Sequence, residues 1–342
     1  NISGGSGNYY EIAQAGLNAG IDGIVTTEHN IYIKENDQYY YRDGKKVLLL
    51  VGEEINDPEE PQRNHLLVLN SSLELAALAS DPQALIDAVR RNRGISILAH
   101  PYAKNNRLMN KPGSPWINWE VKNFTGIEIY NLWDEFKNQS QSIFSYLKNT
   151  FYPAFFPMGG NEESILKWDE LLSDGRMVNA YAGSDSHQTI KKVGPFTFPI
   201  LPYEFHFRCL NNHLFVPQRL SGDLESDKGM VYDALKKGRF FIGLDIIHPS
   251  NGFSFTADGE HQTVFPGERL RFTNSVTLKI HNPKEAVCRL IHNGKVFRQW
   301  EKLRSIPVIT TQPGYYRVES YLPYHQKLRC WIYSNPIYLD KA

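Results

Sequence analysis

Apolar and polar positions in the first two thirds of the chain alternate between a helical spacing and short apolar runs. The helical spacing predicts helices at residues 9–20, 81–94, 163–175 and 227–239. The apolar runs predict strands at residues 22–29, 46–55, 64–70, 95–101, 125–131 and 176–187. Apolar strands that alternate with helices are typical of a parallel sheet covered by helices, either open or closed into a barrel.

Helix boundaries are marked in the sequence by capping residues. Asp81 is placed to cap the second helix, Pro82 stands in its first turn and Gly94 follows its end. Gly20 is expected to end the first helix. Residues 136–160 follow neither spacing, and we expect them to form an excursion over the mouth of the barrel.

The pattern changes near residue 245. Short alternating segments separated by Gly, Pro and Asn predict a small antiparallel β-sandwich. We therefore expect a barrel domain at residues 1–243 and a sandwich domain at residues 244–342. The histidines of the second domain share no obvious face and are expected to bind no metal: His248, His261, His281, His292 and His325.

Composition narrows the classes of function. A length of 342 residues favours two domains, and 37 basic residues balance 37 acidic ones. This balance removes the broad positive field used in nonspecific nucleic-acid binding, so no nucleic-acid partner is expected. No apolar run is long enough to span a membrane. The first ten residues lack the features of a signal peptide, so any signal or anchor is expected upstream of Asn1.

Ligand-type side chains gather where the predicted strands end. They are Glu28 and His29, Glu53 and Glu54, His100, and Asp185 and His187, while His65 stands at the start of a fifth strand. The C-terminal ends of barrel strands form the active-site face, so these side chains are expected to converge. Taken singly, each histidine is as well explained as a structural residue at a strand end. Together, imidazoles and carboxylates favour a site for Zn, Mn or Fe.

The segment Gly183-Ser184-Asp185-Ser186-His187 raises a local question. In an extended backbone, residues i and i+2 point to the same side, which would aim Asp185 and His187 at one point. A solvated turn is the alternative, since Gly, Ser and Asp favour turns.

Strands ending in TEHN, GEE, AHP and GSDSH, in that order, resemble the PHP superfamily, named for polymerase and histidinol phosphatase. The resemblance covers residues 1–243 and implies a distorted seven-stranded (β/α)7 barrel with two or three divalent metals. Most known activities of the family are phosphoester hydrolysis. The segments GIEIYN, WDELLSDGR, ALKKGRFF and WIYSNPIY resemble, more narrowly, the CehA/McbA-type metallohydrolase branch.

The resemblance implies a role for each ligand-type residue. Glu54 matches the carboxylate that bridges two metals, and Asp185 matches a ligand of the first. His65 and His100 match ligands of the second metal. His29 and His187 match ligands of a third metal or of its surroundings, and Glu28 and Glu53 are weaker candidates.

Two departures from the family concern the start of the chain. The family begins with a strand carrying His-x-His, and this sequence begins where the residues after that motif are expected, so we expect the strand upstream of Asn1. Gly4 and Gly5 stand where many relatives supply an Asp or His to the third metal.

The expected reaction is hydrolysis of a small anionic phosphoester by a hydroxide shared between the divalent metals. Asp185 and His187 are the expected catalytic residues, with His187 or a second water protonating the leaving group. Candidate substrate-binding residues near the mouth are Arg63, Tyr102, Lys104 and Asn131. Two alternatives remain: hydrolysis of a carboxylic or carbamic ester at the same centre, and a degenerate domain that binds a ligand without turnover.

Overall fold

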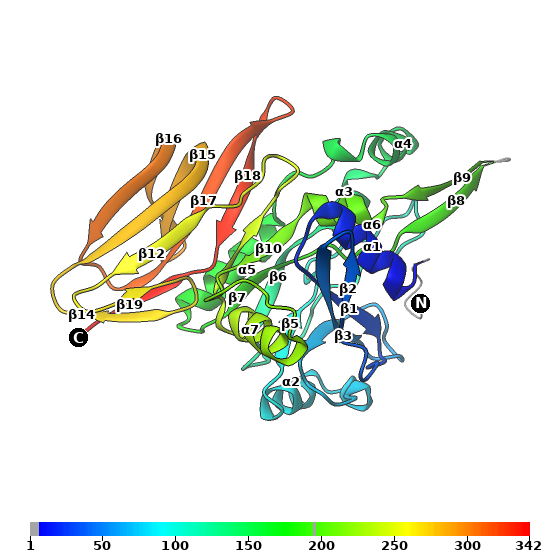
Figure 1. The fold of residues 1–342 in the computed structure, drawn as a ribbon, viewed down its shortest axis with the longest axis horizontal. Coiled ribbons are helices and arrows are strands. Elements are labelled where there is room, and N and C mark those ends of the chain that lie inside the picture. Colours follow the sequence, from blue (N-terminus) through cyan, green and yellow to red (C-terminus); the bar gives the residue numbers. More distant parts are fainter. Residues whose placement is uncertain (1–6, 194–195) are drawn as a thin grey trace.

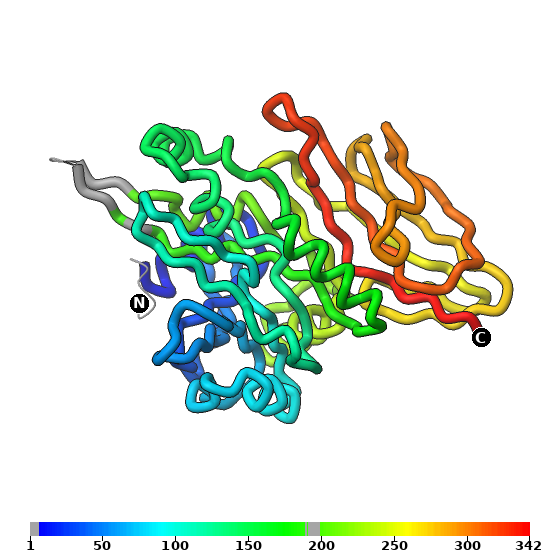
Figure 2. Tube along the Cα trace, turned by 180° about the vertical axis from the view of Figure 1, so that it is seen from behind, coloured from blue at the N-terminus to red at the C-terminus, as the bar shows by residue number. Residues whose placement is uncertain are grey.

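Two large sheets organise the computed structural model, which describes residues 7–193 and 196–342 (Figure 1). Gly4 and Gly5, which bear on a third metal, lie outside the described residues. Figure 2 shows from behind that the N-terminal half, blue to green, and the C-terminal strands, orange to red, lie at opposite ends of the molecule.

The first sheet has seven strands. Six follow the order β1-β3-β4-β5-β6-β7, and the seventh, β2, pairs antiparallel with residues 45–49 of β3. Its strands are β1 Gly23–His29, β2 Gln38–Arg42, β3 Lys45–Ile55, β4 Leu66–Leu69, β5 Ile95–Leu98, β6 Gly126–Asn131 and β7 Asn179–Gly183. The pairs β1–β3, β5–β6 and β6–β7 are parallel. The alternation of apolar strands and helices therefore produced a mixed α/β sheet that is largely parallel.

The prediction of a parallel sheet is wrong at β4, which runs antiparallel to both β3 and β5. Residues 56–65, which join β3 to β4, contain no helix. A parallel connection needs a crossover of a dozen or more residues, so this shorter link returns the chain in the opposite direction. As a result, His65 at the start of β4 lies at the same edge as the ends of β3 and β5.

The four predicted helices are present as α1 Tyr9–Ala19, α2 Pro82–Arg91, α5 Glu162–Ser173 and α7 Leu224–Lys237. Asp81 caps α2 by accepting from the backbone N–H groups of Gln83 and Ala84. Gly20 ends α1 with φ 77°, a left-handed conformation that glycine adopts at little cost. The remaining helices are α3 Leu132–Gln139, α4 Ile143–Phe151, α6 Tyr203–Cys209 and the short 3-10 turns η1 Ala76–Leu78 and η2 Pro153–Phe155.

The first sheet is curled but not closed, since β1 and β7 occupy its two ends among the described strands. Two side-chain amides cover the outer edge of β7. Asn335 accepts from the N–H of Ala180 and donates to its carbonyl, and Asn212 makes the same pair of bonds with Ala182. Because a side-chain amide carries both N–H donors and a carbonyl acceptor, each asparagine replaces one residue of a neighbouring strand.

The second sheet is mostly antiparallel, as the alternating pattern predicts, with one parallel pair between β14 and β19. Its strands are β10 Asn211–Leu214, β11 Phe240–Gly243, β12 Ser254–Asp258, β13 Thr263–Val264, β14 Arg269–Phe272, β15 Val276–His292, β16 Lys295–Thr310, β17 Gly314–Tyr324, β18 Lys327–Ser334 and β19 Ile337–Lys341. Strand β11 pairs with β18, so the sheet takes strands from both sides of position 243. A separate hairpin, β8 Thr189–Val193 and β9 Phe196–Ile200, projects from the first half (Figure 1).

A buried ion-pair network joins the two halves. Arg317 of β17 is 2% exposed and donates to Asp169 of α5 through Nε and Nη2, at 2.9 and 2.6 Å. Its Nη1 donates to Glu319 at 2.5 Å, and its guanidinium lies 5.0 Å from the Trp168 ring. Burial disfavours the charged form of Arg317, but the carboxylates of Glu319 and Asp169 raise its pKa. The guanidinium therefore stays ionised.

We expect Asp169→Ala to destabilise the protein by roughly 3 kcal/mol, because it leaves a buried guanidinium short of one counter-charge. Thermal unfolding of the whole chain measures this. The matched control is Glu170→Ala, since Glu170 neighbours Asp169 but its side chain is 59% exposed and pairs only with Lys167 on the surface. Equal destabilisation by the two substitutions would contradict the role assigned to the network.

Candidate metal centre

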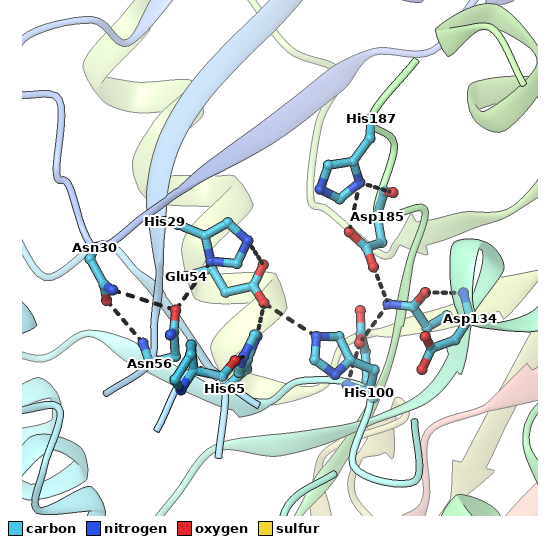
Figure 3. Close-up of polar contacts among 12 residues, drawn as sticks. His29, Asn30, Glu54, Asn56, His65, His100, Asp134, Asp185 and His187 are labelled. Atoms are coloured by element: carbon cyan, nitrogen blue, oxygen red, sulfur yellow. Dashed lines mark hydrogen bonds and ion pairs between the residues drawn. The ribbon is translucent and has the colours of Figure 1, made fainter. Parts of the chain in front are cut away.

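One buried carboxylate lies between three imidazoles at the edge of the first sheet (Figure 3). Glu54 is the last residue but one of β3, His29 ends β1, His65 precedes β4 and His100 follows β5. Glu54 Oε1 lies 2.6 Å from His65 Nδ1 and 3.2 Å from His100 Nε2. Glu54 Oε2 lies 3.9 Å from His29 Nε2. Four elements that are distant in sequence therefore bring their side chains to one point.

Neighbouring groups hold two of the imidazoles by the nitrogen that faces away from Glu54. Nε2 of His65 lies 3.0 Å from the carbonyl oxygen of Pro61, and Nδ1 of His29 lies 3.3 Å from Oδ1 of Asn56. In its neutral form, an imidazole that donates its outward N–H presents the other nitrogen to the centre as an acceptor, the state that binds a metal. A doubly protonated ring donates to Glu54 instead. Histidines that bind metals are commonly held in this way.

Charge compensation dominates the electrostatics of the centre. Burial alone would raise the pKa of Glu54, but hydrogen bonds from His100 and His65 and the charge of His29 lower it well below its usual range. Burial would also lower the pKa of His100, yet the hydrogen bond to Glu54 and the charges of Asp134 and Glu128 raise it to about 10. The carboxylate thus requires positive charge nearby, which either protonated imidazoles or a cation can supply.

The donor set fits a divalent metal. Ligand atoms of His29, Glu54 and His65 all lie within 4.8 Å of one another. Nδ1 of His100 is buried and has no hydrogen-bond partner within residues 7–193 and 196–342. Imidazole and carboxylate donors in such proximity suit Zn, Mn or Fe. The group includes none of the five histidines of residues 244–342.

Asp185 and His187 form a second group, but not by the extended geometry that the sequence suggested. Strand β7 ends at Gly183, and Asp185 adopts φ 47°, a left-handed conformation. His187 folds back so that its Nδ1 lies 2.8 Å from the carbonyl oxygen of Asp185 and 3.2 Å from its Oδ1. The strand therefore ends before Asp185, and the backbone beyond it still places both side chains together.

Glu128 links the two groups and was not singled out from the sequence. Its Oε2 accepts from the backbone N–H of His100 at 2.7 Å and from Nδ2 of Asn131 at 3.1 Å. Asn131 Nδ2 also lies 3.4 Å from Asp185 Oδ2. The available signal was a single acidic residue inside the apolar strand GIEIYN.

A bulge in β6 makes this link possible. The pairing of β6 with β7 shifts register between Glu128 and Tyr130, which brings Glu128 and Asn131 to the same side. Burial raises the pKa of Glu128 to about 7, against the lowering effect of His100 and Asn131. A Cβ atom built on Gly183 would lie 1.8 Å from Glu128 Oε1, so the absence of a side chain there makes room for the carboxylate.

A cavity of about 1140 Å³ opens beside the centre, and residues of β1, β7 and β10 contribute to its lining. Its lining includes His29, Glu54, His100, Asp185 and His187. The volume accommodates a small organic molecule. The two groups of ligand-type side chains therefore share one accessible space.

The candidate substrate-binding residues are placed differently from one another. Asn131 lines the main cavity, and Tyr102 lines a smaller pocket of about 200 Å³ that also reaches His100. Arg63 pairs with Glu60, and Lys104 pairs with Glu163 at 3.1 Å. Neither cation lines these two cavities.

Two further candidates lie near the centre. Glu28 lines the main cavity, whereas Glu53 is fully buried and lies beside Glu74, away from the imidazoles. His206, in α6, was missed from the sequence because it does not stand at the end of a predicted strand. It is fully buried near Asp185 and His187, and burial lowers its pKa to about 4.

Fold and site together define an α/β protein with a candidate divalent-metal centre. No protein-family model and no curated protein matches the chain. Among solved structures, it is similar to a two-domain protein from Bacteroides vulgatus that contains a predicted PHP-like metal-dependent phosphoesterase. The identity is 16%, with 97% of this chain and 92% of that chain covered and a TM-score of 0.42. At this level the likeness carries no argument about the residues of this chain.

We expect zinc to bind more tightly as pH rises from about 6 to about 8, because the metal must displace protons from His100 and its neighbours. Isothermal titration calorimetry in two buffers of different ionisation enthalpy would count the protons released. His100→Ala should weaken binding by at least about tenfold. His281→Ala, in the second sheet, is the control and should bind zinc as the unchanged protein does. Binding without proton release would contradict the assignment.

Gly183→Ala should displace the Glu128 carboxylate and weaken zinc binding, because the new methyl group occupies its position. Gly229→Ala is the matched control, since a Cβ there meets nothing within 4 Å and lies in α7. Alanine also favours a helix, so the control should be as stable as the unchanged protein or more so. Unaltered zinc affinity in Gly183→Ala would show that Glu128 does not support the centre.

Proposed function

We propose that the protein is a metal-dependent hydrolase of a small anionic phosphoester, with Glu54, His65, His100 and Asp185 as the main metal ligands and His29 and His187 beside them. The observation that carries the proposal is the buried Glu54 carboxylate shared by three imidazoles at the wall of a substrate-sized cavity. The resemblance of the strand-end motifs to the PHP superfamily and its CehA/McbA branch supports the same reaction. Divalent metals held there would activate water and offset the charge of a phosphoester.

Side chains on the opposite side of the cavity would complete the reaction. Nδ1 of His187 lies within hydrogen-bond distance of the carbonyl oxygen of Asp185, so this nitrogen carries the proton and Nε2 remains for exchange with the substrate. Such a histidine can take up a proton at Nε2 and then donate it to the leaving group. His187 is part-exposed, which allows proton exchange with solvent.

Asp185 has a different role in the proposal. Its carboxylate is held by Asn131 and lies near buried Glu128, so this side of the cavity carries negative charge. That charge would attract a cation rather than a phosphate. Asp185 is therefore assigned to the metal and His187 to the leaving group.

We expect Asp185→Asn to lose metal and turnover together, because the substitution keeps the shape but removes the charge. His187→Asn should retain most of the metal and lower kcat by roughly 100-fold, since general acid–base catalysis contributes about that factor. Metal content by elemental analysis, measured beside hydrolysis of an aryl phosphate, separates the two outcomes. Equal metal loss in both variants would make His187 a principal ligand.

The alternative activities give distinct results in the same assay. Turnover of an aryl carboxylic ester without turnover of the phosphate would indicate the ester hydrolase. Metal binding without turnover of either substrate, in a chain that includes the expected upstream His-x-His strand, would indicate a binding domain. Either result would overturn the phosphoesterase proposal.

A further inference from the structure

Apolar side chains gather on one exposed surface around helix α4. Of the 19 large apolar side chains that are exposed among the described residues, six lie within residues 143–155, and Phe144 is 80% exposed. They form what we call the α4 patch: Ile143, Phe144, Leu147, Phe151, Tyr152 and Phe155. Contiguous apolar patches of this kind mark interaction surfaces.

Helix α4 presents its apolar stripe to solvent and its polar side to the protein. Ile143, Leu147 and Phe151 recur at helical spacing and are 67%, 46% and 61% exposed. Asn149, on the other side, is 4% exposed and donates to the carbonyl of Gln139 at 3.0 Å and to Ser140 Oγ at 3.1 Å. Rotating the helix to bury the apolar stripe would break these buried hydrogen bonds, so the outward orientation is built into the fold.

The two segments that contain the α4 patch and the hairpin attached to it carry only positive charge. Residues 136–161 and 320–330 contain no Asp or Glu. Lys148 is exposed with its Nζ 5.3 Å from the Phe155 ring, and Lys327 is exposed at the tip of the β17–β18 hairpin. The hairpin is attached to the patch, because His325 stacks on Phe155 at 3.9 Å and Tyr324 donates to the carbonyl of Ala154. Figure 1 shows α4 and this hairpin on the same, upper side of the molecule.

We propose that the α4 patch docks on the surface of an anionic lipid bilayer. An exposed apolar stripe flanked by lysines is the arrangement by which interfacial helices insert among lipid headgroups while their cations meet anionic lipid. The patch lies on a projecting helix beside a hairpin tip, and a fluid bilayer accepts such a surface without the shape complementarity that a protein partner needs. In the described part of the chain no helix is long and apolar enough to cross a membrane.

The α4 patch adjoins the candidate metal centre. Tyr146 lies on the inner side of α4, with its ring centroid 6.0 Å from that of Phe136. The Phe136 ring stacks on Trp133, with the ring centroids 5.5 Å apart. The Trp133 ring lies 6.0 Å from His187. A row of aromatic rings thus connects the docking helix to the mouth of the cavity, and docking would hold that mouth close to the bilayer surface.

Vesicle co-sedimentation of the whole chain tests the proposal. We expect the protein to sediment with vesicles of phosphatidylcholine and phosphatidylglycerol, and at least about fivefold less with phosphatidylcholine alone. Phe144→Glu with Phe151→Glu should reduce binding to the anionic vesicles by about tenfold or more, because both side chains would enter the interface. Lys148→Gln with Lys327→Gln should reduce only the part of binding that about 0.5 M salt also removes.

Ile309→Glu is the matched control, since Ile309 is 68% exposed on β16 and lies outside the α4 patch. It should bind the anionic vesicles as the unchanged protein does. Failure of the unchanged protein to sediment with anionic vesicles would overturn the proposal. Concentration-dependent dimers in light scattering that the phenylalanine substitutions abolish, without vesicle binding, would assign the patch to a second copy of the chain instead.

Discussion

The burial of one carboxylate, Glu54, sets the requirement that the rest of the site meets. A buried carboxylate is stable only when hydrogen bonds and positive charge replace the water it has lost. Three imidazoles from three other elements provide both. The sheet register contributes directly, because β1 and β3 pair in parallel with His29 opposite Glu54. A shift of one residue would turn one of these side chains to the other face.

The site also depends on backbone conformations that few residues adopt easily. Asn30 and Asn64, which flank His29 and His65, have φ 55°, and His100 and Asp185 have φ 29° and 47°. Asparagine and aspartate tolerate the left-handed region better than most residues, whereas for histidine this conformation costs more free energy. Such conformations cluster at functional sites, where surrounding contacts hold them in place. Here the N–H of His100 is held by Glu128.

The C-terminal residues complete the first half of the molecule. Asn335 occupies the backbone groups of Ala180 on β7, and Arg317 reaches Asp169 on α5. Strand β7 leads directly into Asp185 and His187. The second sheet therefore supports the strand that delivers these two side chains, although the metal-type cluster includes none of its own histidines.

Sequence alone determined the local elements and most of the ligand-type residues. Helices such as α2 were predictable because Asp81, Pro82 and the apolar spacing act within a few residues. The gathering of His29, Glu54 and His100 followed from their places at strand ends, whereas His65 joins them because β4 runs antiparallel. Tertiary structure decided the direction of β4 and the bulge that places Glu128 in the site. It also decided the left-handed backbone conformation at Asp185. These features depend on pairing between distant strands and on the space above Gly183, which local spacing does not encode.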